Sequence, residues 1–125
     1  GDLIPYLASH ATGIDVGGVA VCVAVGDQPT VPPPAGAVTA RIDFLYPDQP
    51  CVVGSVERRD HLPEGVVEAV ALAGPGQALA LPPDSHVSGR FGYVVSTAPS
   101  TAACAAVAEH GRESLVLTVA TRIPA

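Results

Sequence analysis

The sequence predicts an α+β fold: an N-terminal helical lead-in, then a mostly antiparallel sheet of about five strands with one Ala-rich helix packed on it. Three observations indicate this architecture. Residues 1–26 place apolar side chains at helical spacing. Residues 37–120 contain short alternating or β-branched runs separated by proline and glycine. Residues 101–110 are rich in alanine and follow a serine that can cap a helix.

The composition is that of a folded chain with a small-residue core. The 125 residues are enough for one domain, or for a piece of a larger protein. Hydrophobic residues make up 48% of the chain, but only three Tyr and two Phe are aromatic and there is no Trp or Met. The core must therefore be built from Val, Leu, Ile and Ala.

The charge argues against nucleic acid as a partner. The six basic residues are all Arg and the net charge is -6, whereas phosphate binding needs a positive patch. The only basic pair, Arg58-Arg59, lies between Glu57 and Asp60.

The chain is also expected to stay out of membranes. The longest apolar stretch, Val16 to Val25, is about half a membrane span. No basic segment precedes an apolar run as in a signal peptide. We therefore expect a soluble, cytoplasmic protein. Widely spaced Cys22, Cys51 and Cys104 fit neither a disulfide framework nor a metal site, so we expect buried thiols in a reducing compartment.

The first 26 residues predict two helical segments. The first has Leu3, Ile4, Leu7, Ala8 and Ala11 at helical spacing, with Asp2 as its N-cap and Gly13 as its left-handed end. Asp15 can cap the next segment. From propensity alone, Val16 to Val25 fits a strand slightly better than a helix, and both remain open.

Residues 27–36 carry four prolines and predict an ordered linker. The chain is thus divided into a lead-in (1–26), a linker (27–36) and a β-rich subdomain (37–125).

The β-rich part begins with two runs, 37–47 and 51–57, that we expect to form an antiparallel hairpin. Further strands are expected at 66–73 and 90–97, with a short edge strand at 77–81 and a last strand at 114–120. The Ala-rich helix should begin after Ser100 or Thr101 and end at Gly111 in the left-handed conformation. A strand–helix–strand unit implies that the last two long strands are parallel, or that the helix crosses an end of the sheet.

No local motif predicts catalysis. None of the four histidines has zinc-ligand spacing. His86 follows Asp84 and Ser85, but neighbours in sequence cannot form a relay, which needs groups from separate elements. Cys104 has no cationic neighbours in sequence that would favour its thiolate. His110 is expected to be a favourable charge partner for the C-terminus of its helix.

Two stretches resemble ATP-grasp carboxylate–amine ligases of the L-amino-acid-ligase type. In that family a motif E-x-N-x-R-x-G-G-D is followed by I-P-x-L, by A-T-G-x-D, and by a helix ending in A-x-G-x-x-P. The matching residues here are Gly1-Asp2, Ile4-Pro5, Leu7, Ala11-Thr12-Gly13, Asp15, Ala24, Gly26 and Pro29. The second stretch resembles the family's C-terminal subdomain at 40–45, 62–68, 90–94 and 101–119. The resemblance favours a helix over Val16 to Val25.

The resemblance implies a C-terminal ligase piece without its nucleotide site. The family's magnesium ligands, acyl-phosphate Arg and ATP-binding Lys residues lie upstream of the position that corresponds to Gly1. Only Gly1 and Asp2 carry over, at the edge of the amino-substrate pocket. ATP and magnesium are thus expected as cofactors of the whole protein, with no cofactor, metal or catalytic residue in this chain.

Three functional hypotheses follow. The first is a C-terminal subdomain that packs on an ATP-grasp core, shapes the substrate pocket and is not catalytic alone. The second is a stand-alone binding module, with a second copy of itself as partner in a homodimer formed through residues 1–26. The third is an unrelated small enzyme that uses His86 or Cys104.

Overall fold

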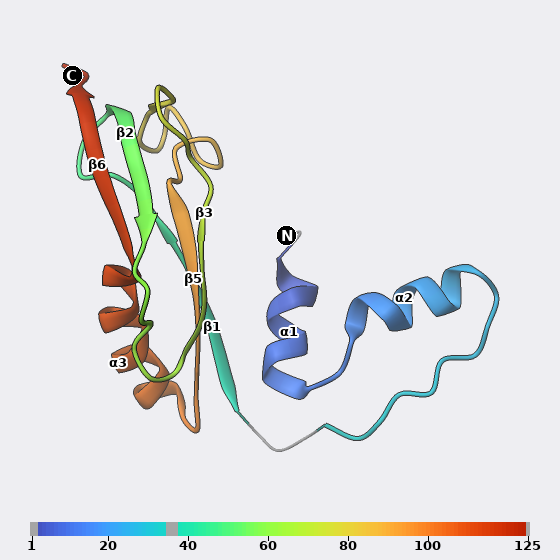
Figure 1. Ribbon diagram of the computed structural model, residues 1–125. Coiled ribbons are helices and arrows are strands. Elements are labelled where there is room, and N and C mark those ends of the chain that lie inside the picture. The colour runs from blue at the N-terminus through green and yellow to red at the C-terminus, as the bar shows by residue number, and fades with distance from the viewer. Residues whose placement is uncertain (1–2, 35–37, 125) are drawn as a thin grey trace.

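The computed structural model describes residues 3–34 and 38–124, and Figure 1 shows how these form helices on either side of a β-rich body. The elements are α1 (Ile4–Thr12), α2 (Val16–Ala24), β1 (Thr39–Leu45), β2 (Cys51–Arg58), β3 (Val66–Ala71), β4 (Ala78–Leu79), β5 (Gly92–Ala98), α3 (Thr101–Gly111), the 3-10 helix η1 (Arg112–Ser114) and β6 (Leu115–Arg122).

The strands form two antiparallel sheets that share one core. Their orders are β1–β5–β3 and β4–β2–β6, and every pairing is antiparallel. Leu45 and Val94 of the first sheet belong to the same buried cluster as Val53 and Leu115 of the second. The predicted α+β architecture is confirmed, with six strands among the described residues where about five were expected.

The predicted hairpin between residues 37–47 and 51–57 is wrong. β1 pairs along its whole length with β5, from Thr39 opposite Ala98 to Leu45 opposite Gly92. β2 pairs with β4 and β6 in the other sheet. The physical reason is burial: β5 is central in its sheet and its Val94, Val95 and Ser96 are at most 1% exposed, so an edge strand on each side covers more apolar surface than a local hairpin does.

The Ala-rich helix begins as predicted and ends differently. The Ser100 hydroxyl accepts the Ala103 N–H at 3.2 Å and caps α3. Gly111 is right-handed (φ -61) and leads straight into η1, so the predicted left-handed end is wrong. A Cβ at Gly111 would lie 3.0 Å from Val66 Cγ2 and 3.1 Å from Val94 Cγ1. Close packing on the sheet therefore explains this glycine.

The strand before α3 and the strand after it are not parallel neighbours. β5 lies in the first sheet and β6 in the second, so α3 carries the chain from one sheet to the other. α3 contacts β5 and β1 on the face where the two sheets meet. The alternative in which β5 and β6 pair in parallel is wrong.

The N-terminal helices agree with the sequence signals. Gly13 ends α1 in the left-handed conformation (φ 72), and the Asp15 carboxylate accepts the Gly18 N–H at 2.9 Å. Val16 to Ala24 is helical, as the ligase resemblance indicated. Leu3 precedes α1 and provides no side-chain cap, while Asp2, the predicted cap, lies outside the described residues.

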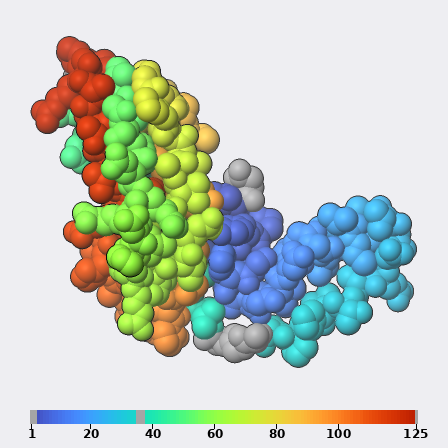
Figure 2. Space-filling view, viewed as in Figure 1, coloured from blue at the N-terminus to red at the C-terminus, as the bar shows by residue number. Residues whose placement is uncertain are grey.

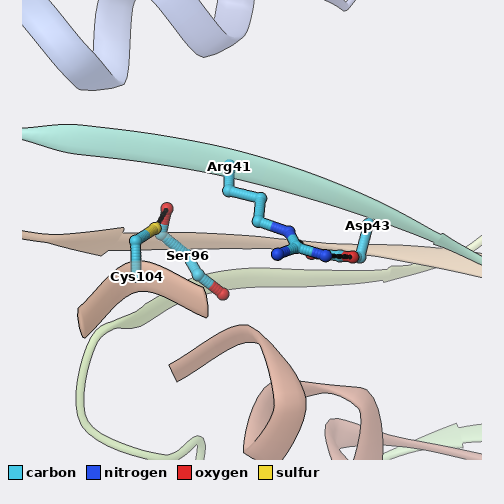
Figure 3. A network of polar contacts seen from close by, with 4 residues as sticks. All are labelled: Arg41, Asp43, Ser96 and Cys104. Carbon is cyan, nitrogen blue, oxygen red and sulfur yellow. Dashed lines mark hydrogen bonds and ion pairs between the residues drawn. The ribbon is translucent and has the colours of Figure 1, made fainter. Parts of the chain in front are cut away.

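α1 and α2 differ in how they contact the rest of the chain. α1 contacts β1 and β5, on the side of the first sheet opposite α3 (Figure 3). α2 contacts α1 and has no buried residue. Figure 2 shows α2 and the residues that follow it extending away from the β-rich body. We call residues 14–34 the N-terminal arm.

Candidate functional site

Four residues from three elements meet where α3 packs on the first sheet (Figure 3): Arg41 and Asp43 of β1, Ser96 of β5 and Cys104 of α3. Arg41 Nε donates to Asp43 Oδ2 at 2.9 Å, and Arg41 Nη2 donates to Asp43 Oδ1 at 2.8 Å. Residues two apart on a strand point to the same face. This spacing places both charged groups on the α3 side of β1.

The chemistry of this cluster is structural. Cys104 is 1% exposed and its Sγ donates to the Ser96 carbonyl oxygen at 3.5 Å. Burial raises the pKa of the Cys104 thiol; the charge of Arg41 lowers it and that of Asp43 raises it further. A nucleophilic cysteine needs an accessible thiolate. The cluster therefore holds a protonated thiol against the sheet, and the hypothesis of an enzyme based on Cys104 loses its support.

The other two cysteines, Cys51 and Cys22, differ in how deeply they are buried. Cys51 is 1% exposed, and burial raises its thiol pKa as well. Cys22 on α2 is only half-buried. The expectation of buried thiols is thus confirmed for Cys51 and Cys104 and wrong for Cys22, which lines a surface cavity together with Pro29 and Pro32 of the linker.

The histidines do not converge on a reactive centre. The His86 backbone carbonyl accepts the Tyr46 hydroxyl at 2.8 Å, while the Ser85 hydroxyl lies 2.6 Å from that of Ser88. His110 Nδ1 lies 3.0 Å from the Ala106 carbonyl oxygen within α3. Over residues 3–34 and 38–124, no group of three His, Cys, Asp or Glu side chains could hold a metal ion.

A cavity of about 560 Å³ lies at the end of β2, where Glu57 to His61 face Val116 of β6. Both signs of charge line it. One of its arginines already has a structural role: the Arg59 N–H and Nε donate to the Ser114 and Glu113 carbonyl oxygens at 2.9 and 2.7 Å. The remaining polar lining consists of Glu57, Arg58, Asp60 and His61, with no cysteine, serine or threonine among the lining residues.

The two N-terminal helices expose several large apolar side chains. Val21, Val23 and Val25 are 64%, 58% and 70% exposed, and Ile4 of α1 is 68% exposed. Val21 and Val25 are four residues apart and so lie on the same side of the helix, and exposed apolar surface is characteristic of an interaction site. Gly1 and Asp2, the predicted substrate-side residues, precede α1 and lie outside the described residues.

Within the described ranges, no single helix is long and apolar enough to cross a membrane. α1 and α2 taken together have the length and composition for a span, but they are bent by 117° relative to each other.

Comparisons with known proteins identify the fold. The sequence matches no protein-family model and no curated protein. The structure is similar to phosphoribosylglycinamide synthetase from Anaerococcus prevotii (TM-score 0.74, 10% identity), over 94% of this chain and 30% of that one. It is also similar to L-amino acid ligase from Bacillus licheniformis (TM-score 0.69, 15% identity), over 92% of this chain and 29% of that one.

The chain has the fold of one part of each of these two enzymes. One of these two structures is an L-amino acid ligase, the type of enzyme that the sequence resembles, and at 15% identity the similarity shows a shared fold. The chain spans about 30% of the length of either ligase. Nearly all of this chain, N-terminal arm included, therefore corresponds to one part of a longer enzyme fold.

The contact between Arg41 and Asp43 was not among the features predicted from the sequence. The signal was present, because an R-x-D spacing inside a predicted strand places both side chains on one face. The position of this pair near Cys104 was not predictable, since it requires α3 to cross this particular part of the sheet.

Proposed function

We propose that this chain is the C-terminal subdomain of an ATP-dependent carboxylate–amine ligase. The observation that carries the proposal is a fold shared over more than nine-tenths of the chain with two ligases, of which it spans about 30%. Most of the motif residues of the first matching stretch lie in α1, in α2 or at the ends of these helices. The same helices hold the exposed apolar surface.

The exposed valines of α2 support a specific arrangement. A nine-residue helix with two glycines and no buried residue has little intrinsic stability. Such a helix is stabilised when its apolar side is covered. The occupant we infer is the remainder of the ligase, the nucleotide-binding core, against which Val21, Val23 and Val25 would pack.

In this proposal the chemistry belongs to the whole protein. ATP phosphorylates a carboxylate to give an acyl phosphate and ADP, and an amine then displaces phosphate to form the amide. Magnesium and the nucleotide are bound by the core, and the protein works in the cytoplasm. Gly1 and Asp2 border the amine side of the substrate pocket, and the β-rich body supports that border.

The test is ADP release by the full-length protein that contains this chain, assayed with magnesium, ATP and a panel of amino acids. We expect ADP release to require both a carboxylate and an amine. The 125-residue chain alone should release none. ADP release that proceeds equally without any amine would overturn the proposal.

A matched pair of variants tests the packing of α2. In the full-length protein, Val21→Asp with Val23→Asp should abolish ADP release, because charges would be buried against the core. Val87→Asp introduces one such charge at a position that is 73% exposed in a loop, and it should keep activity. Equal losses in both variants would contradict the role assigned to α2.

The exposed valines also fit a second candidate, a stand-alone module that dimerises through the N-terminal arm. It predicts that the 125-residue chain elutes as a dimer and that Val21→Asp with Val23→Asp makes it a monomer. The ligase proposal predicts no such specific, saturable dimer.

A further inference from the structure

A cavity of about 230 Å³ opens between the two sheets beside the turn that joins β1 to β2. Its apolar floor consists of Cys51, Phe91, Leu117 and Val119. Cys51 and Phe91 are 1% and 8% exposed. Tyr46, Asp48 and Arg122 contribute polar groups to the lining. No residue of α1 or of the N-terminal arm takes part.

The walls are tied together by the backbone. The Phe91 N–H donates to the Leu45 carbonyl oxygen at 2.9 Å, and the Ile123 N–H donates to the Pro50 carbonyl oxygen at 2.9 Å. These two bonds hold the turn against β5 on one side and against the end of β6 on the other. The cavity is therefore preformed, which is usual for small-molecule sites.

One polar residue of the lining, Tyr46, is also fixed in place. The Tyr46 hydroxyl accepts Arg90 Nε at 3.0 Å and donates to the His86 carbonyl oxygen at 2.8 Å. Arg90 in turn stacks 3.7 Å from the centroid of the Phe44 ring. Tyr46 is thus held by partners outside the cavity while its ring remains part of the lining.

Asp48 and Arg122 both line this cavity, and they do not form an ion pair with each other. In the part of the chain that the structure describes, the only ion pair joins Arg41 and Asp43. The Asp48 carboxylate and the Arg122 guanidinium are both exposed. Arg122 lies opposite Cys51 in the pairing of β2 with β6, next to the apolar floor. The site thus offers an anion, a cation and an apolar surface.

We infer that this cavity binds a small zwitterion with a hydrocarbon body. Its ammonium group would pair with Asp48, its carboxylate would accept hydrogen bonds from Arg122, and its apolar part would cover Phe91, Leu117 and Val119. Arg suits this role because its planar guanidinium can donate two parallel hydrogen bonds to one carboxylate. The inference does not depend on the proposed ligase function, since it requires neither ATP nor the missing core.

The experiment is a titration of the ¹⁵N-labelled 125-residue chain, followed by NMR, with leucine as the probe. Isoamylamine lacks the carboxylate and 4-methylpentanoate lacks the ammonium, so these probes separate the two charged contacts. Titration to about 20 mM covers the millimolar dissociation constants expected of so small a ligand. We expect shifts confined to residues 46–51, 91 and 117–122, with leucine binding about fivefold more tightly than either analogue, near the upper range for exposed ion pairs.

Charge-removing variants assign the contacts. Arg122→Gln should lower leucine affinity to that of isoamylamine, and Asp48→Asn should lower it to that of 4-methylpentanoate. Arg112→Gln and Asp60→Asn remove exposed charges that do not line the cavity and should leave affinity unchanged. Val119→Trp, which fills the cavity, should abolish binding of all three probes while the β6 resonances show that the fold is intact.

The inference is overturned if leucine causes no saturable shifts, or if the two analogues bind as tightly as leucine. It is equally overturned if the control variants weaken binding as much as Arg122→Gln does. Because none of these measurements involves ATP, a negative result here leaves the test of ligase activity untouched.

Discussion

The buried thiols of Cys51 and Cys104 should ionise at a higher pH than the thiol of a free cysteine, and they should react more slowly. Burial raises the pKa of both, and both side chains are inaccessible, whereas Cys22 is half-buried on α2. We expect iodoacetamide near neutral pH to label Cys22 first, which mass spectrometry of the intact protein would detect. In urea all three should react at similar rates. Faster labelling of Cys104 than of Cys22 in the folded protein would contradict the structural role of the Cys104 cluster.

The same raised pKa values predict the direction of one pH effect on stability. The folded protein keeps the thiol proton at pH values where the unfolded chain, with a thiol pKa of about 8.5, has begun to lose it. This contribution to stability is present below the unfolded pKa and is lost as pH rises through the folded pKa. Urea midpoints measured from about pH 7 to 10 should therefore fall, and Cys51→Ala should reduce the steepness of that fall.

Gly92 is a second residue whose environment makes a clear prediction. A Cβ there would overlap Leu115 Cδ1 and lie 2.7 Å from the Val70 carbonyl oxygen. Since that oxygen belongs to a paired strand, Gly92→Ala should destabilise the fold by about 1–3 kcal/mol in denaturant unfolding. Gly74→Ala is the matched control, because no atom lies within 4 Å of the position of its Cβ. Similar losses for the two variants would show that packing between the sheets is looser than described.

At the scale of single elements, Ser100 should account for a measurable part of the stability of α3. Its hydroxyl accepts the Ala103 N–H, and removing an N-cap of this type costs about 1 kcal/mol. Ser100→Ala should lower the free energy of unfolding by that amount, whereas the exposed neighbour Thr101→Ala leaves the cap in place. An unchanged free energy in Ser100→Ala would mean that water replaces the cap without loss.

α2 should be the least stable helix when the 125-residue chain is alone. It is nine residues long and has no buried side chain, and isolated helices of that length are marginal in water. In hydrogen exchange its amides should exchange far faster than those of β5, and Asp15→Ala should accelerate them further by removing the cap. Protection of α2 equal to that of β5 would mean that a second copy covers it.

These elements also show what the sequence could and could not predict. Helix ends could be predicted from the sequence at Gly13, Asp15 and Ser100, because each of these residues acts on the backbone within a few residues of itself. The partner of β1 was not, because pairing with β5 depends on which apolar faces bury each other. The left-handed end predicted at Gly111 was wrong for the same reason, because this glycine is required by the packing of α3 on the sheet. The cavity beside Asp48 and Arg122 likewise exists only once β6 has been placed beside β2.

At the scale of the whole molecule, the distribution of exposed apolar residues is uneven. The β-rich body has its own core, shared by both sheets and covered by α3. The N-terminal arm has exposed valines instead. A body with its own core, joined to an arm with exposed valines, supports the proposal that the arm packs on the rest of a larger enzyme.

The mass of the native protein in its source cell tests this account most directly, by immunoblot against the 125-residue chain. The chain is 12.5 kDa and spans 30% of the synthetase that shares its fold, and dividing the first by the second gives about 42 kDa. The account predicts a band of roughly that mass or larger, and ADP release from the same purified protein. A single band at 12.5 kDa would contradict it and would establish this chain as an independent module.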